Sequence, residues 1–175
     1  MSSVRLINET SATSVTSLRL TDVFSSEFDV YQIHIPEGTN NSGGGSANII
    51  FQLVDVNGGI INTANYDYTH IVTFSYSATA DTRNTNQTSI PSVSFNYAAT
   101  AYGAATDIYL FNPYKSKYTY ILYESIGWNS ANVGTVGLKG VAVLKTTDVC
   151  KGFAITRQSN SFDNVAVQVY GLKEN

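Results

Sequence analysis

The chain has 175 residues, only 13% of them charged, and a formal net charge of −3. Its length fits one domain whose core needs no disulfide or metal ion. So few charges cannot cover the outer faces of many helices, and the negative net charge disfavours general nucleic-acid binding. No apolar run is long enough to span a membrane. With 19 Ser, 19 Thr and 16 Asn supplying the polarity, the composition predicts a soluble β-protein.

Apolar and polar residues alternate in segments that recur about every ten positions, which is the spacing of a β-sandwich or barrel. The first clear segment is 31–35, and residues 48–54 form the next predicted strand. Between them, residues 39–46 are polar and contain three successive glycines, which predicts a flexible loop. After them, Asn57-Gly58-Gly59 predicts a hairpin turn, because Asn-Gly readily takes the positive φ angles of a tight turn.

The clearest alternation runs from Tyr66 to Tyr76 and places His70 on an otherwise aromatic and apolar face, with Ile71 as the one apolar residue opposite. Residues 78–89 are polar throughout and predict a long loop. Further strands are predicted at 93–97, 107–111, 118–124, 141–144, 153–156 and 165–170. No stretch of twelve or more residues keeps a capped helical period. We therefore expect an all-β fold, an antiparallel β-sandwich with almost no helix.

We expect a single domain over residues 14–175. The N-terminal residues 1–13 allow two interpretations. They carry a short apolar patch, Val4, Leu6 and Ile7, before a polar stretch. As an arm outside the core they would add a strand to a neighbouring chain and serve as the attachment segment. As the alternative, they form the first strand of their own domain. The segment lacks the apolar core of a signal peptide, which predicts synthesis in the cytosol.

Residues for catalysis are scarce. The two histidines are predicted on the outer face of a strand, His34, and on a core-facing stripe, His70. Cys150 is the only cysteine, which excludes an internal disulfide and a cysteine-based zinc site. Paired carboxylates of a polysaccharide-acting enzyme are always conceivable among 13 acidic residues, but most lie at predicted turns. We expect no enzyme, no catalytic residues, no metal site and no cofactor.

The 12 Tyr and 8 Phe have two interpretations. Most alternate on predicted strands and indicate core or subunit contact, since Tyr is favoured at protein interfaces. Tyr102, Tyr114 and Trp128 instead lie in or near predicted loops, where a ring can stack on a sugar while a neighbour such as Asn129 binds its hydroxyls. These four residues are the candidate ligand or partner contacts.

Four segments together carry a family resemblance: residues 23–33 (VFSSEFDVYQI), 64–68 (ANYDY), 108–114 (IYLFNPY) and 162–173 (FDNVAVQVYGLK). In this order they resemble small β-domains in virion proteins of tailed phages, notably marine and cyanobacterial phages. Those domains occur as head-decoration proteins, spikes and tail-fibre tips. The resemblance implies a jelly-roll-like sandwich, a place in the virion and often a homotrimer, and it supplies no fixed catalytic set.

The sequence contains no heptad, repeat or second domain of the kind that builds a fibre. The expected function is therefore capsid decoration. The protein would be assembled in the host bacterial cytoplasm and dock on the major capsid protein or another virion protein at the virion surface. The alternative is an adhesin at a tail or spike tip that binds host surface glycans, and a polysaccharide-acting enzyme comes third.

Overall fold

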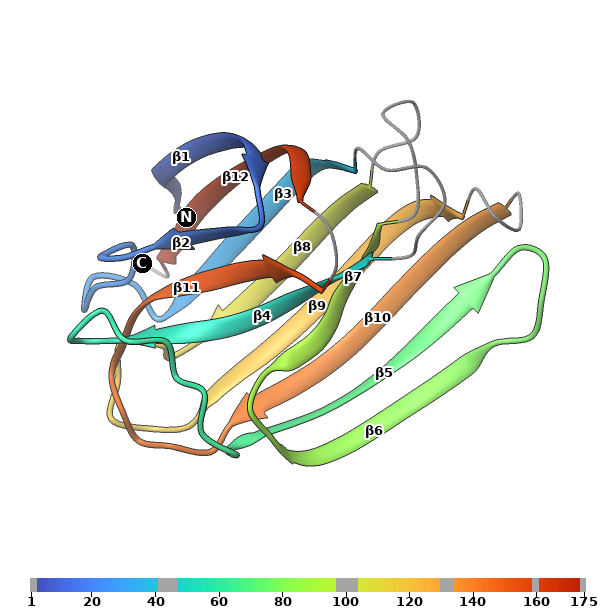
Figure 1. Ribbon diagram of the computed structural model, residues 1–175. Helices are drawn as coiled ribbons and strands as arrows, with labels where there is room; N and C mark the ends of the chain where they lie inside the picture. Colours follow the sequence, from blue (N-terminus) through green and yellow to red (C-terminus); the bar gives the residue numbers. More distant parts are fainter. Residues whose placement is uncertain (1–2, 41–46, 97–103, 130–133, 159–160, 174–175) are drawn as a thin grey trace.

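The computed structural model describes residues 3–40, 47–96, 104–129, 134–158 and 161–173. Within these residues twelve strands form two antiparallel sheets that pack face to face, and no segment is helical (Figure 1). The antiparallel β-sandwich predicted from the alternation is therefore confirmed.

Eight strands form the larger sheet and four the smaller one. In spatial order the larger sheet is β1 (Ser3–Val15), β12 (Phe162–Lys173), β3 (Val30–Asn40), β8 (Ala104–Phe111), β9 (Thr119–Asn129), β10 (Gly134–Leu144), β5 (Tyr66–Phe74) and β6 (Ala80–Gln87). The smaller sheet is β2 (Ser17–Leu20), β11 (Cys150–Arg157), β4 (Ala47–Asp55) and β7 (Ile90–Asn96).

The strand order contains a complete jelly roll. The runs β1-β12-β3-β8 and β2-β11-β4-β7 are the two four-stranded sheets of an eight-stranded jelly roll. Two antiparallel pairs, β9 with β10 and β5 with β6, continue the first sheet beyond β8. We call these four strands the sheet extension. The jelly-roll-like architecture is thus confirmed, with one sheet twice as wide as the other.

The core lies between the sheets and is rich in aromatic rings. Phe153 of β11 stacks on Phe51 of β4, with ring centroids 5.7 Å apart, and on Phe24 at 6.1 Å. Tyr66 of β5 is fully buried, and its hydroxyl accepts a hydrogen bond from the Leu53 amide at 2.9 Å. Such rings bury large areas, and the buried hydroxyl is satisfied, so this packing stabilises the sandwich.

The predicted hairpin turn is confirmed. Gly58 has a φ of +83°, and the Gly58 amide donates to the Asp55 carbonyl at 3.1 Å. The Asp55 carboxylate also accepts the amides of Asn57 and Gly59, both at 2.8 Å. A residue with a Cβ is strained at this φ, which explains the glycine.

The prediction of a loop at residues 78–89 is wrong, because residues 80–87 form strand β6. Among the described strands it pairs only with β5, and it is the outermost strand of the extension. Its side chains are exposed or half-buried along its whole length. An edge strand with no buried face needs no apolar alternation, so the period-2 signal was absent. The Asp67 carboxylate helps to hold β6 by accepting the Asn86 amide at 2.8 Å.

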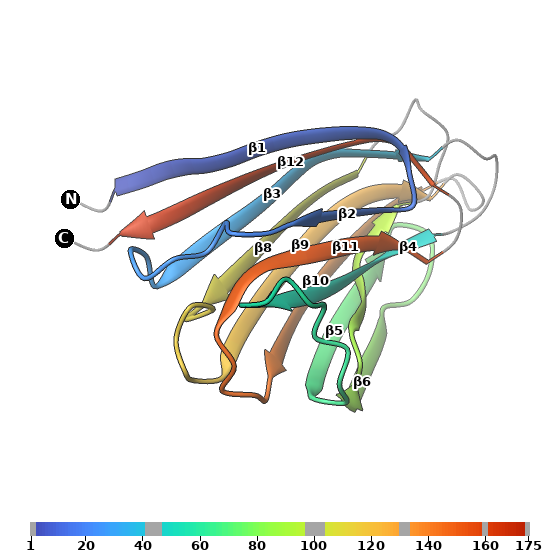
Figure 2. The same ribbon diagram turned by 60° about the vertical axis from the view of Figure 1, so that its left-hand side comes forward.

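The N-terminal segment lies in the larger sheet. Residues 3–15 form β1, which pairs with β12 from Ser3 opposite Lys173 to Val15 opposite Phe162. Figure 2 shows the two strands side by side, with both chain ends at the same corner. This is the arrangement of the second interpretation, a first strand on its own domain; residues 1–2 lie outside the described part.

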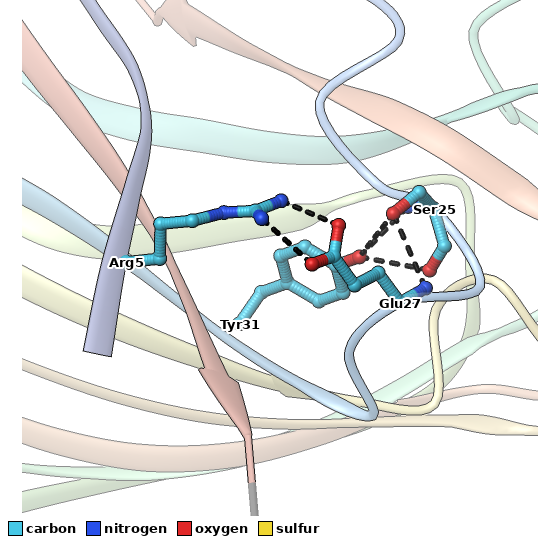
Figure 3. A network of polar contacts seen from close by, with 4 residues as sticks. All are labelled: Arg5, Ser25, Glu27 and Tyr31. Atoms are coloured by element: carbon cyan, nitrogen blue, oxygen red, sulfur yellow. Dashed lines mark hydrogen bonds and ion pairs between the residues drawn. The ribbon is translucent and has the colours of Figure 1, made fainter. Parts of the chain in front are cut away.

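Side-chain contacts also tie β1 to the domain (Figure 3). Arg5 donates from both terminal nitrogens to the Glu27 carboxylate, from Nη1 to Oε1 at 2.6 Å, and lies over the Phe28 ring at 4.7 Å. The loop that carries Glu27 is fixed in turn by Tyr31, whose hydroxyl donates to the Ser25 carbonyl at 2.8 Å and accepts the Ser25 amide at 2.7 Å. The start of β1 is therefore anchored within the molecule.

Candidate docking surface on the larger sheet

One face of the larger sheet packs on the smaller sheet, and the opposite face, which we call the outer face, is turned away from it. Strands β5 and β10 show the alternation, since their inner residues are buried and most of their outer ones exposed. Seven of the ten large apolar side chains that are exposed among the described residues lie on the outer face: Val4, Leu6, Ile71, Phe111, Tyr120, Ile126 and Val141. Exposed apolar patches of this kind mark sites of interaction.

Near the middle of the outer face lies the antiparallel pair β9–β10, which we call the β9–β10 centre. Its register places Tyr120 opposite Val143, and Leu122 opposite Val141. Further along, it places the ion pair Glu124 and Lys139 opposite each other, and then Ile126 and Gly137. Two apolar pairs are thus followed by a charged pair and then by a large residue beside a glycine.

A groove of about 850 Å³ crosses the outer face of the extension next to these pairs. Gly137 and Ala105 lie low in its lining, because neither has a long side chain, and Ile71 and Ile126 stand beside them. Ile71 and Ile126 are 52% and 59% exposed, so apolar area is open to solvent at this groove. Hydroxyl groups from β5 and β10 and the charged side chains of Asp107, Glu124 and Lys139 complete the lining.

The charges beside the groove are only loosely paired. Lys139 Nζ lies 3.6 Å from Glu124 Oε2, and these side chains are 70% and 52% exposed. Such a solvated pair contributes little to stability, so both charges can contact another molecule. On the neighbouring strand, Asp107 Oδ1 accepts a hydrogen bond from Gln32 Nε2 at 2.8 Å and lies 2.9 Å from His34 Nδ1.

Tyr109 of β8 lies close enough to Asp107 and Glu124 to be affected by their charges. Burial raises the pKa of its phenol, and the negative charges of Asp107 and Glu124 raise it further. Its hydroxyl therefore stays protonated well above neutral pH and is available as a hydrogen-bond donor. Tyr109 stands opposite Leu122, which continues the apolar pairs of the β9–β10 centre onto β8.

Of the four candidate ligand residues from the sequence, Tyr114 and Trp128 have described side chains, and these two lie near opposite ends of β9. Tyr102 lies outside the described residues. Tyr114, in the turn between β8 and β9, is half-buried and packs against the core. Trp128 is half-buried near the far end of β9, opposite Thr135 on the outer face, and Asn129 ends that strand with its side chain outside the described part. Trp128 lies about 30 Å along β9 from Thr119, where the strand begins after the turn that holds Tyr114.

The predicted attachment residues divide between the two faces of β1. Val4 and Leu6 are 63% and 48% exposed and stand opposite Leu172 and Tyr170 on the outer face. Ile7 lies at a β-bulge and packs partly buried against the core. Two of the three residues are therefore available for contacts with another molecule.

The two histidines and the cysteine lie in different surroundings. His70 is buried, as expected, with Nδ1 3.2 Å from the Tyr123 hydroxyl, and burial lowers its pKa. Burial raises the pKa of the Cys150 thiol to about 12, which leaves almost no thiolate at neutral pH. His34 is half-exposed on the outer face, as predicted. No three His, Cys, Asp or Glu residues of the described ranges gather as a metal site.

Comparison with known proteins adds no relative. No protein family, curated protein or solved structure matches the chain. In the part of the chain described above, no helix is long and apolar enough to cross a membrane. Functional inference therefore depends on the outer face and on the sequence resemblance.

The outer face was not predicted from the sequence. One signal for it was present, because Ile71 is the only apolar residue on the wrong side of the alternation in 66–76. The others, Ile126 and Val141, become visible as one surface only when β9 and β10 are known to be neighbours.

Proposed function

We propose that the protein is a non-catalytic structural subunit of a bacteriophage virion surface, of the capsid-decoration type, and that it docks through its outer face. The observation that carries this proposal is the gathering of exposed apolar side chains on that one face. A free-standing protein rarely exposes so many large apolar groups together, whereas a subunit covers them on assembly. The sequence resemblance to virion β-domains supports the same role and a virion assembled in the bacterial cytoplasm.

The composition of the outer face suits permanent docking. Its aromatic members include Tyr109, Phe111, Tyr120 and Tyr170, whose rings bury large areas with few rotatable bonds. The large exposed side chains of this face are aliphatic or aromatic, so removal of apolar area from water contributes most to docking there. The partners we propose are the major capsid protein or another virion protein, together with further copies of this chain.

The β1 end of the outer face is the part we propose for contact with the particle. Val4 and Leu6 are exposed there, and β1 is the edge strand of the larger sheet, with no neighbour on its free side among the described strands. Deleting residues 1–13 would not test this, because β1 pairs with β12 along its length and Arg5 binds Glu27. Substitution of the two exposed side chains avoids that damage.

The test compares Val4→Ser/Leu6→Ser with Val56→Ser in virions of the phage. Val56 is 47% exposed beside the β4 hairpin and not on the outer face, so its variant is the matched control. We expect the double variant to fold normally but to lose most of its occupancy on purified particles, as measured by quantitative mass spectrometry and antibody labelling in electron microscopy. Absence of the unaltered protein from particles, or full occupancy of the double variant, contradicts the proposal.

A second candidate, a glycan-binding adhesin, is favoured by the groove. Its volume of about 850 Å³ accommodates a short oligosaccharide, and hydroxyls and carboxylates line it beside apolar walls. Trp128 stands opposite Thr135, which lines the groove, so in this role Trp128→Ala would weaken binding to host glycans and leave assembly intact. A glycan array that stays silent with the intact protein removes this candidate and leaves decoration.

A further inference from the structure

We propose that two copies of this chain stack with their outer faces together, about a two-fold axis that runs parallel to the strands between β9 and β10. This inference rests on the proposed function only in treating the outer face as a docking surface, and it names a second copy as the partner of the β9–β10 centre. Such an axis places β9 of one copy over β10 of the other. Each outer residue of β9 then lies over its own cross-strand neighbour in the second copy.

The shapes of the outer residues are complementary under this symmetry. Ile126 stands opposite Gly137 within one chain, so in the stack Ile126 of each copy lies over Gly137 of the other. Ile126 is 59% exposed and projects from the face, while Gly137 lies low in the groove lining. A projecting side chain thus meets a hollow twice in one interface.

The charges are complementary as well. Glu124 of each copy lies over Lys139 of the other, because the two residues are also cross-strand neighbours. Within one chain they are 3.6 Å apart and largely solvated, so little pairing energy within the chain is given up when they contact the second copy. A two-fold axis one strand away, between β8 and β9, would instead place Asp107 over Glu124, since these carboxylates are opposite each other in that pair. Like charges there would repel, which favours the β9–β10 axis.

The remaining central pairs are apolar. Leu122 lies over Val141 and Tyr120 over Val143 of the second copy. Tyr120 and Val141 are 55% and 51% exposed in the single chain, so the stack removes substantial apolar area from water. Sheets stack at about 10 Å with their strands within about 30° of each other, which keeps these central residues in register near the axis.

The available area is sufficient for a specific dimer. The axis exchanges β9 with β10, β8 with β5 and β3 with β6, so six strands of each copy overlap. Strands lie about 4.8 Å apart and rise about 3.4 Å per residue, so six strands of about eight residues present about 29 Å by 27 Å, or about 800 Å² per copy. Specific interfaces bury about 800 Å² per partner, so the stack has the area of a typical one. Because the axis lies within the extension, Val4 and Leu6 at the β1 end stay uncovered and available for the particle.

The test uses charge reversal in the purified full chain. Sedimentation at micromolar concentration should show a dimer for the unaltered protein. Glu124→Lys gives each copy two cations at the axis, and Lys139→Glu gives each copy two anions, so each single variant should raise the dissociation constant at least tenfold. An equimolar mixture of the two variants should restore a heterodimer, because each cationic residue then lies over an anionic one. Circular dichroism and thermal unfolding verify that both variants fold.

A second variant tests the shape complementarity. Ile126→Ala should also weaken the dimer at least tenfold, whereas Val56→Ser, the matched exposed control outside the outer face, should not. A monomeric unaltered protein, a trimer such as the family resemblance implies, or a mixture of the charge variants that stays monomeric overturns the inference. Sedimentation measures the dimer, and occupancy on particles measures the virion role. Either result can therefore contradict its own proposal without affecting the other.

Discussion

Two glycines of β10 occupy comparable positions on opposite faces of the same sheet. A Cβ added at Gly140, on the inner face, would lie 2.3 Å from Tyr123 Cζ, because the tyrosine ring already occupies that space. A Cβ added at Gly137, on the outer face, would meet only the Thr73 hydroxyl oxygen at 2.9 Å. The chain therefore fills one hollow with its own aromatic ring and leaves the other open beside Ile126.

The two faces of β9 and β10 serve different purposes: the inner face stabilises the folded chain, and the outer face is available for association. The inner face of the extension is satisfied within one chain, since Tyr123, Gly140 and His70 pack together and are buried. The outer face of β9 and β10 also carries large apolar side chains, beside the Glu124–Lys139 pair, yet these contribute little to folding because they are exposed in the single chain. Substitutions on the two faces of β9 and β10 should therefore affect different equilibria.

The largest effect should come from truncating tyrosines on the two faces of β9. Tyr123→Ala removes a fully buried ring and should lower the free energy of unfolding by about 4 kcal/mol. Tyr120→Ala, on the same strand and 55% exposed, should change it by less than about 0.5 kcal/mol. Urea unfolding, at a protein concentration too low for self-association, measures both. Similar losses for the two variants would contradict the comparison.

A smaller difference is expected between the two glycines. Gly140→Ala should cost about 2 to 3 kcal/mol, because the new methyl group displaces the Tyr123 ring in a packed core. Gly137→Ala should cost less than about 1 kcal/mol, since the Thr73 side chain can rotate away from the methyl group. Combining Gly140→Ala with Tyr123→Leu should recover part of the cost. If the losses in unfolding free energy of the two single variants simply add in the double variant, the Tyr123 ring is not what makes Gly140→Ala destabilising.

The smallest effect concerns the pH dependence of the inner face. Burial lowers the pKa of His70 below its usual 6.5. Below about pH 6.5 the unfolded chain therefore binds a proton at His70 that the folded chain does not, and the free energy of unfolding falls as the pH drops toward the folded-state pKa. His70→Gln should flatten this fall in urea unfolding between about pH 6.5 and 5. An unchanged slope in the variant would assign the acid sensitivity to other groups.

Much of the inner face was predictable from the sequence. The alternation from Tyr66 to Phe74 placed Tyr66, Tyr68 and His70 correctly in the core, because a strand with one buried face must repeat every two residues. The Asn57-Gly58 turn was predictable for a local reason too, since few sequences adopt a positive φ without strain.

The edges and the outer face were not predictable in this way. Strand β6 has no buried face, and β1 is held mainly by β12, whose residues lie more than a hundred positions away in the sequence. The docking surface depends on the order of strands, which brings Ile71 of β5 and Ile126 of β9 to one groove across β10. Such non-local pairings leave no periodic signal in any one segment.

The pairing of Ser3 with Lys173 makes the chain suitable for circular permutation. Because the two ends leave the sheet at the same corner, a short glycine-rich linker can join them into a closed loop (Figure 2). New ends can then be opened in the exposed hairpin at Asn57, where no ladder of the core would be cut. A protein fused to the new ends would then be attached at the hairpin after β4. The fusion point would no longer adjoin β1, the strand that carries Val4 and Leu6.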